Sequence, residues 1–139
     1  MKTAIRYYSR GGNTGKLAQA ISEAIGVKAE TTDVPLQEDV DILFLGSSVY
    51  AYGVDDNVKD FISKINVKVG KVVNFSTAAL IKSTYKQVGK LLAEKGIPQA
   101  KEEFYCKGEF GPMHKGKPDE NDLKKAAEFA RKVVHGEDE

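Results

Sequence analysis

The chain of 139 residues has one cysteine, no tryptophan and only short apolar runs. Its lone cysteine, Cys106, excludes an internal disulfide and fits a reducing compartment. The longest apolar runs, Ile42–Leu45 and Ala78–Ile81, span four residues, whereas a membrane-spanning helix needs about 20. No apolar stretch typical of a signal peptide follows the first basic residue. We therefore expect a cytoplasmic protein without membrane contact.

Positive and negative side chains are nearly equal in number, and the chain has few candidate catalytic groups. The net charge is +1 at pH 7, so no global field draws the chain to nucleic acid. His114 and His135 have no metal-ligand spacing with another His or Cys, so we expect surface residues and no metal site. No GxSxG nucleophile motif occurs. Without a visible nucleophile or acid–base pair, the chemistry is expected to come from a cofactor.

The apolar pattern predicts short strands that alternate with amphipathic helices. At this length we expect one domain, over residues 1–139. The expected strands are Ile5–Tyr8, Val27–Val34, Val40–Gly46, Lys71–Ser76 and Glu102–Lys107. Such alternation predicts an α/β fold, a three-layer doubly wound sandwich around a five-stranded parallel sheet. Right-handed crossovers and the chain length favour the strand order 2-1-3-4-5.

The first expected strand runs into a glycine-rich turn and then a helix, IRYYSRGGNTGKLA from Ile5 to Ala18. The N–H groups in the first turn of a helix lack intrahelical partners, and the helix dipole adds partial positive charge there. Ser9, Asn13 and Thr14 add further hydrogen-bond donors. We interpret this segment as a phosphate-binding turn.

An ordinary turn would explain part of the same pattern. Asn13 or Thr14 could cap the helix, and Gly11-Gly12 could form a tight turn. A Walker A loop is excluded, because Leu17 stands where Ser or Thr should hold magnesium.

Two more segments are expected beside this turn, at the point where the winding of the sheet reverses. These segments are Ser47–Gly53 and Ser76–Ala79. Tyr50 and Tyr52 suit a flat aromatic ligand, unless either one folds back onto the first helix. The second segment offers hydroxyls and N–H groups to a polar ring edge, or it is a plain connection between a strand and a helix.

Three basic side chains are given no functional role. Arg6 lies inside an expected strand, where a solvated or snorkelling side chain is expected. Lys115 and Lys117 are expected in a solvated loop.

The motif residues together resemble the flavodoxin family. The phosphate-loop pattern of that family is matched by Ile5, Tyr7, Ser9, Gly12, Thr14 and Ala18, and Arg6 departs from it where an apolar or aromatic residue is usual. The similarity continues through a GSSVYAYG segment, an FSTA turn and a late FYCKGEF…KGKP segment.

This resemblance implies FMN as the cofactor. Its phosphate would be held by Ser9, Arg10, Gly11, Gly12, Asn13 and Thr14. The ring would lie against Ser48, Val49, Tyr50, Ala51, Tyr52 and Gly53, with Tyr50 or Tyr52 stacked on it. Its polar edge would be lined by Ser76, Thr77, Ala78 and Ala79. Gly53 is the candidate for a peptide that turns its carbonyl toward the reduced flavin, since glycine tolerates both backbone states.

The resemblance also implies a function, a low-potential single-electron carrier. Such a protein is expected to be a monomer that meets its redox partner proteins transiently. Carriers of this family are usually acidic, whereas this chain is nearly neutral. The alternatives are a small FMN-dependent NAD(P)H or quinone reductase, and a flavodoxin-like module without redox activity.

Overall fold

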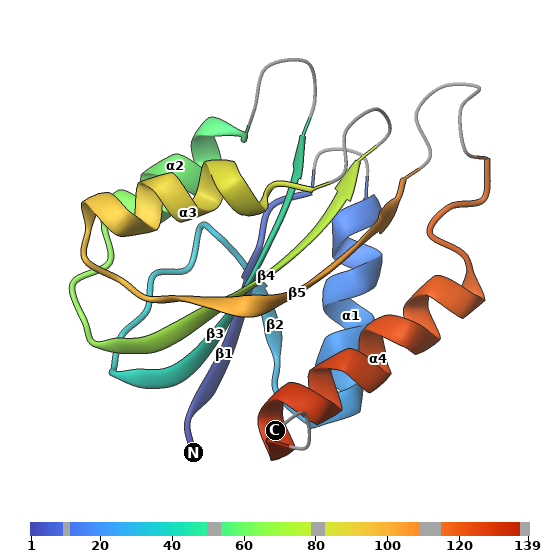
Figure 1. Cartoon of the computed structure of the whole chain (residues 1–139), viewed down its shortest axis with the longest axis horizontal. Coiled ribbons are helices and arrows are strands. Elements are labelled where there is room, and N and C mark those ends of the chain that lie inside the picture. Colours follow the sequence, from blue (N-terminus) through green and yellow to red (C-terminus); the bar gives the residue numbers. More distant parts are fainter. Residues whose placement is uncertain (10–11, 50–53, 79–82, 109–114, 137–139) are drawn as a thin grey trace.

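The computed structural model describes residues 1–9, 12–49, 54–78, 83–108 and 115–136. Within these ranges the chain forms five strands and four helices (Figure 1). The strands are β1 Thr3–Tyr7, β2 Ala29–Thr31, β3 Val40–Val49, β4 Val69–Ala78 and β5 Gln99–Lys107. The helices are α1 Asn13–Ile25, α2 Asp56–Ser63, α3 Tyr85–Glu94 and α4 Glu120–His135. Every strand pair is parallel and the order is β2-β1-β3-β4-β5, which confirms the predicted fold.

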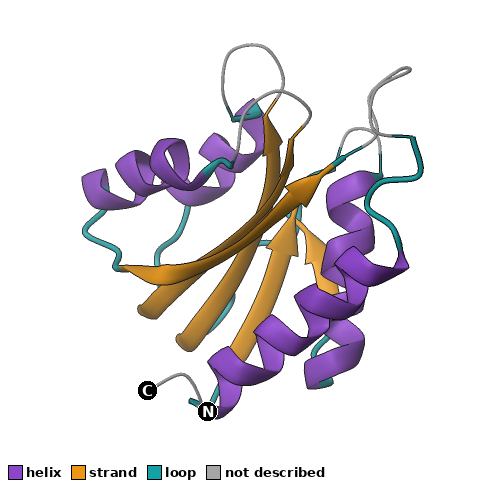
Figure 2. Cartoon of the chain, turned by 45° about the vertical axis from the view of Figure 1, so that its right-hand side comes forward, coloured by secondary structure: helices purple, strands orange, loops and turns teal. Residues whose placement is uncertain are grey.

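The sheet is covered by helices on both faces (Figures 1 and 2). Side chains alternate along β3, so that Leu43 and Leu45 pack in the cluster under α2 and α3. Ile42 and Phe44 pack in the cluster under α1 and α4. Because both faces of a central parallel strand are buried, its sequence is a continuous apolar run rather than an alternating one.

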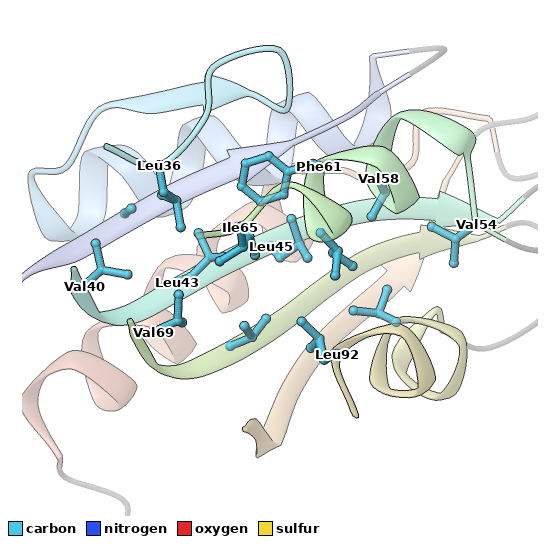
Figure 3. Close-up of a cluster of buried hydrophobic side chains, with 14 residues drawn as sticks. Leu36, Val40, Leu43, Leu45, Val54, Val58, Phe61, Ile65, Val69 and Leu92 are labelled. Atoms are coloured by element: carbon cyan, nitrogen blue, oxygen red, sulfur yellow. The ribbon is translucent and has the colours of Figure 1, made fainter. Parts of the chain in front are cut away.

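Helix side chains fill both clusters, and on one face some of them are small. Figure 3 shows the first, where Phe61 of α2 and Leu92 of α3 meet β3 and β4, together with Leu36 from the connection between β2 and β3. On the opposite face, Ala18 of α1 and Ala130 of α4 are fully buried. Small side chains allow these two helices to pack closely against the sheet and each other.

The predicted ends of the two central strands were wrong. β3 continues past Gly46 to Val49 and β4 continues past Ser76 to Ala78. Serine is a weak strand former, but Ser47 pairs with Ser76 in the sheet, and the pairing goes on to Val49 and Ala78. Pairing with a neighbouring strand therefore outweighs local propensity here.

The lengths predicted for two other strands were also wrong. β2 covers only Ala29–Thr31, because β1 ends at Tyr7 and offers no partner beyond Thr31. β5 begins at Gln99, where Pro98 O already accepts the N–H of Val72 on β4.

Arg6 is buried, so the expectation of a solvated side chain was wrong. It is 7% exposed, and its Nε donates to Val34 O at 2.7 Å while Nη1 donates to Ile5 O at 3.0 Å. Glu30 Oε2 lies 3.5 Å from Nη2. Burial lowers the pKa of the Arg6 guanidinium, and the Glu30 carboxylate opposes that shift. The side chain ties the chain segment after β2 to the centre of the sheet.

Helix α4 begins with a capping box. Asp119 Oδ1 accepts the N–H of Asp122 at 2.9 Å, and Asp122 Oδ2 accepts the N–H of Asp119 at 3.0 Å. The N–H of Asp122 and the ammonium of Lys117 lower the pKa of Asp119 to about 2. Lys117, expected in a solvated loop, lies 3.0 Å from Asp119 Oδ2 and 3.2 Å from Asp122 Oδ2. No helix of the described ranges has the length and apolar character to cross a bilayer.

The close packing of Gly46 generates the first prediction. A Cβ at Gly46 would overlap Cε2 and Cζ of Phe75, whose ring is fully buried. We expect Gly46→Ala to lower the free energy of unfolding by about 2 kcal/mol, because a packed ring must move. Urea unfolding measures the change. Gly15→Ala is the control, since its Cβ would lie 3.4 Å from Tyr7 Cε2, an ordinary contact. An unchanged unfolding midpoint for Gly46→Ala would contradict the packing.

Candidate functional site

The carboxyl ends of the strands and the start of α1 meet at one end of the sheet (Figure 2). The chain moves from β1 outward to β2, then returns to β3 on the other side of β1. The winding therefore reverses between β1 and β3. In open α/β sheets, ligands bind outside the strand ends at such a point.

Helix α1 starts without a side-chain cap. Its N-cap residue is Gly12, at φ +92°. Glycine has no side chain that could accept a hydrogen bond from the first N–H groups of the helix. The alternative in which Asn13 or Thr14 is the N-cap was therefore wrong, since both lie inside the first turn. The N–H of Lys16 makes the first intrahelical bond, to Gly12 O at 3.1 Å. The preceding N–H groups of the turn lie where a helix attracts anions.

Space for a ligand lies beside this helix end. A Cβ at Gly12 would meet no atom of the described residues within 4 Å. The left-handed backbone favours glycine there, because a side chain would be strained at that φ. An anion can therefore approach the backbone from this side.

The hydroxyl of Ser9 points to the same helix turn. Its Oγ lies 3.8 Å from the place that a Cβ at Gly15 would take. Ser9 Oγ is buried, and it has no hydrogen-bond partner within the part of the chain that the structure describes. A buried hydroxyl without a partner costs about 1–3 kcal/mol. A phosphate oxygen would remove that cost, so the residues present fit a phosphate group.

Thr14 uses its hydroxyl to hold the helix against the sheet. Its Oγ1 donates to Ser47 O at 3.2 Å and lies 2.9 Å from Thr77 Oγ1. A hydroxyl has one proton, so Thr77 is the donor in the second bond. The backbone N–H of Thr14, rather than its hydroxyl, is then the group that remains for an anion.

A second group of buried polar side chains supports the ends of β3 and β4. Thr84 Oγ1, just before α3, accepts from Ser47 Oγ at 2.8 Å and from Asn74 Nδ2 at 3.0 Å. The N–H of Thr84 donates to Ser76 Oγ at 3.4 Å. All four side chains are fully buried. Sequence analysis missed Asn74 and Thr84. A threonine before a helix is typical of an ordinary N-cap, so Thr84 gave no signal of a further role.

The structure brings together the predicted residues of α1, β3 and β4. Ser48 pairs with Thr77 in the sheet, and Val49 pairs with Ala78. These four residues were expected in loops, but they lie in strands that support the site, as does Ser76, which was expected at a strand end. Seven predicted site residues lie outside the described residues, and their roles stay predictions: Arg10, Gly11, Tyr50, Ala51, Tyr52, Gly53 and Ala79.

The described residues offer no reactive group of their own at this site. Cys106 lies on β5, where burial and then the Asp122 carboxylate raise the pKa of its thiol to about 12. The thiol is therefore neutral at physiological pH and a weak nucleophile. No group of three or more His, Cys, Asp or Glu side chains among the described residues could hold a metal ion. His135 is exposed at the end of α4, as expected for a surface residue.

The contacts of Thr84 predict a large effect of a nearly isosteric change. Thr84→Val would remove the acceptor of two buried donors, Ser47 Oγ and Asn74 Nδ2. We expect a loss of about 2–4 kcal/mol in the free energy of unfolding. Chemical unfolding measures it, with Thr84→Ser as the control that keeps the hydroxyl. Equal stability of the two variants would contradict the assigned bonds.

The environment of Cys106 predicts slow alkylation. At about pH 8, iodoacetamide should react with the native protein at least about a hundredfold more slowly than with the urea-unfolded chain, because thiolate is the reactive form. The rate can be followed by the mass increase of the intact protein. Equal rates in the two states would show that the native thiol is accessible and that its pKa is not raised.

Comparisons with known sequences show the family of this chain. A family model described as a flavodoxin domain matches residues 4–116. An uncharacterized protein of Methanocaldococcus jannaschii is 32% identical over an alignment of 149 positions, which covers 96% of this chain and 99% of the relative.

Solved structures show the same fold at low identity. A flavodoxin from the domain Archaea superposes with a TM-score of 0.79 at 19% identity, covering 98% of both chains. Flavodoxin 2 from Bacillus cereus gives 0.72 at 20% identity, covering 98% of this chain and 99% of the other. Rubredoxin oxygen:oxidoreductase from Desulfovibrio gigas gives 0.67 at 15% identity, and the match spans 97% of this chain but 35% of that larger one. The chain therefore belongs to the flavodoxin domain family, and FMN is its cofactor, as the sequence predicted.

Proposed function

We propose that this protein is a low-potential single-electron carrier that uses FMN to pass electrons between redox partner proteins. The observation that supports this most directly is the uncapped start of α1 beside the Ser9 hydroxyl, which has no hydrogen-bond partner among the described residues. Together they form an anion site built from neutral donors. Such a site holds a phosphate through hydrogen bonds and the helix dipole.

The chain's own residues bind and orient the cofactor. Ser9 Oγ and the N–H groups of Asn13 and Thr14 hold the phosphate end. When bound, FMN supplies reversible electron transfer, which needs no covalent step with a side chain. The ends of β3 and β4 support the ring end, and the bonds of Thr84 keep them in place.

A carrier role fits the scarcity of reactive groups. Cys106 is the only cysteine of the chain, and its raised pKa keeps it neutral. The protein would then act as a monomer that meets its partners transiently. With a net charge of +1, long-range attraction contributes little to those encounters.

The carrier proposal predicts how electrons enter the protein. An anaerobic redox titration of the FMN-loaded protein, followed by visible absorption, should show two resolved one-electron steps. Mixing with NADH or NADPH and a quinone should give no turnover unless a separate reductase is added. Direct turnover would instead favour the FMN-dependent reductase. Failure to retain FMN would favour a module without redox activity.

One variant tests the phosphate contact within the same experiment. We expect Ser9→Ala to weaken FMN binding about tenfold, which corresponds to the loss of one hydrogen bond to a charged group. Ser22→Ala, farther along α1, is the control and should bind as the wild type does. Equal affinities of the two variants would remove Ser9 from the site.

A further inference from the structure

A pocket of about 220 Å³ lies between α2 and the connection that joins β2 to β3. None of the residues that line it is among those predicted to hold FMN. Sites for drug-sized ligands measure about 300–1,000 Å³. This pocket is therefore too small for a flavin and has room for a ligand of only a few heavy atoms.

One wall of the pocket is fixed by Arg6. The guanidinium Nε donates to Val34 O at 2.7 Å, and Nη2 lies 3.5 Å from Pro35 O. The N–H of Thr32 donates to Tyr7 O at 3.0 Å, which ties the same wall to the end of β1. Arg6 departs from the flavodoxin pattern, where an apolar or aromatic residue is usual, so this fixed wall is a feature of the present chain.

The floor of the pocket is apolar. Leu36, Phe61 and Ile65 line it, and each is less than 9% exposed. Figure 3 shows these three side chains within the first hydrophobic cluster. A ligand with a short carbon chain could bury that chain against them, which is favourable in water.

The charged groups of the lining leave one carboxylate without a partner. The lining contains the carboxylates of Asp33 and Asp60 and the ammonium of Lys64. Lys64 Nζ lies 2.9 Å from Asp60 Oδ2, so these two charges offset each other. Asp33 takes part in none of the ion pairs between described residues. The remaining negative charge favours a cationic ligand.

The hydroxyl of Thr32 is a second polar group of the lining that lacks a partner. The residue is 8% exposed, and its Oγ1 has no hydrogen bond to any part of the chain that the structure describes. Buried polar atoms in proteins nearly always have a partner, so a lone buried hydroxyl beside a pocket indicates a missing ligand group.

We propose that this pocket binds a primary alkylammonium group. An ammonium has three N–H donors and no acceptor, which suits a lining whose unsatisfied groups are a carboxylate and a hydroxyl. The ammonium donates to Asp33 and to Thr32 Oγ1, and its carbon chain lies against Leu36 and Phe61. Such a group occurs in free aliphatic amines and in the lysine side chains of other proteins. This site is separate from the proposed carrier function and does not depend on it.

The test titrates the FMN-loaded protein with n-butylamine at about pH 7 and follows the backbone amide signals by NMR. We expect a dissociation constant of about 1 mM, with the largest shifts in residues 32–36 and 57–65. Butan-1-ol has the chain without the charge, and ammonium chloride has the charge without the chain. Each should bind at least about tenfold more weakly. Equal binding of butan-1-ol would overturn the inference, as would the absence of saturable shifts with n-butylamine.

Asp33→Asn tests the charge in the pocket. We expect this variant to bind n-butylamine about tenfold more weakly than the wild type. Asp56→Asn is the matched control, because it removes the same charge from the first turn of α2. The Asp56 side chain is 98% exposed and does not line this pocket. Its affinity should stay within about twofold of the wild type. An equal loss in both variants would show surface attraction alone and overturn the inference.

Thr32→Val tests the hydroxyl. We expect about fivefold weaker binding of n-butylamine with an unfolding midpoint in urea that is no lower than that of the wild type. The midpoint is expected to hold because the change removes no hydrogen bond between described residues. A lower midpoint would show that the fold uses this hydroxyl and would overturn its assignment to a ligand, as would unchanged affinity.

A third compound distinguishes the two sources of the ammonium group. Nα-acetyl-lysine methylamide has the same four-carbon chain and ammonium joined to peptide groups. Similar dissociation constants for this compound and n-butylamine support the lysine side chain of another protein as the ligand. Binding of n-butylamine alone supports a free amine. Binding of neither compound would overturn the inference.

Discussion

One buried side chain joins the parts of the structure on which the site depends. The hydroxyl of Thr14 bonds Ser47 O on β3 and Thr77 Oγ1 on β4, so the first turn of α1 is tied to two neighbouring strands. Thr14 is fully buried, and its polar atom must find partners there or cost stability. The position of the helix end is therefore set by a requirement of the fold. Its N–H groups are held in place before any ligand arrives.

That arrangement explains how a nearly neutral chain can hold an anion. The start of α1 offers backbone N–H groups and lies beside the hydroxyl of Ser9, and a helix dipole attracts anions at this end. Charged side chains elsewhere serve the fold. Arg6 is buried and bonds backbone carbonyls near β2, and Lys117 bridges the two carboxylates that start α4. The described charged side chains named here thus contribute to stability, whereas the anion site is built from neutral groups.

Much of the fold could be predicted because its causes are local. The apolar run of β3 and the helical spacing of Leu17, Ala18 and Ile21 follow from burial on particular faces. The strand ends could not be predicted in the same way. Ser47 and Ser76 have weak strand propensity, and they are extended because each is the other's partner in the sheet. Arg6 was misjudged for a similar reason, since its acceptors lie far along the chain at Val34 and Pro35.

By itself, the sequence determined the order of the elements, the strand order of the sheet and the phosphate motif with its family. Those features depend on residue type and on spacing over a few turns or strands. Only the tertiary structure decided what each site residue does. It gives the hydroxyl of Thr14 two partners and that of Ser9 none within the described residues. It also brought Thr84 to the ends of β3 and β4. Hydrogen-bond partners and free space are set by residues distant in sequence, and spacing along one chain does not encode them.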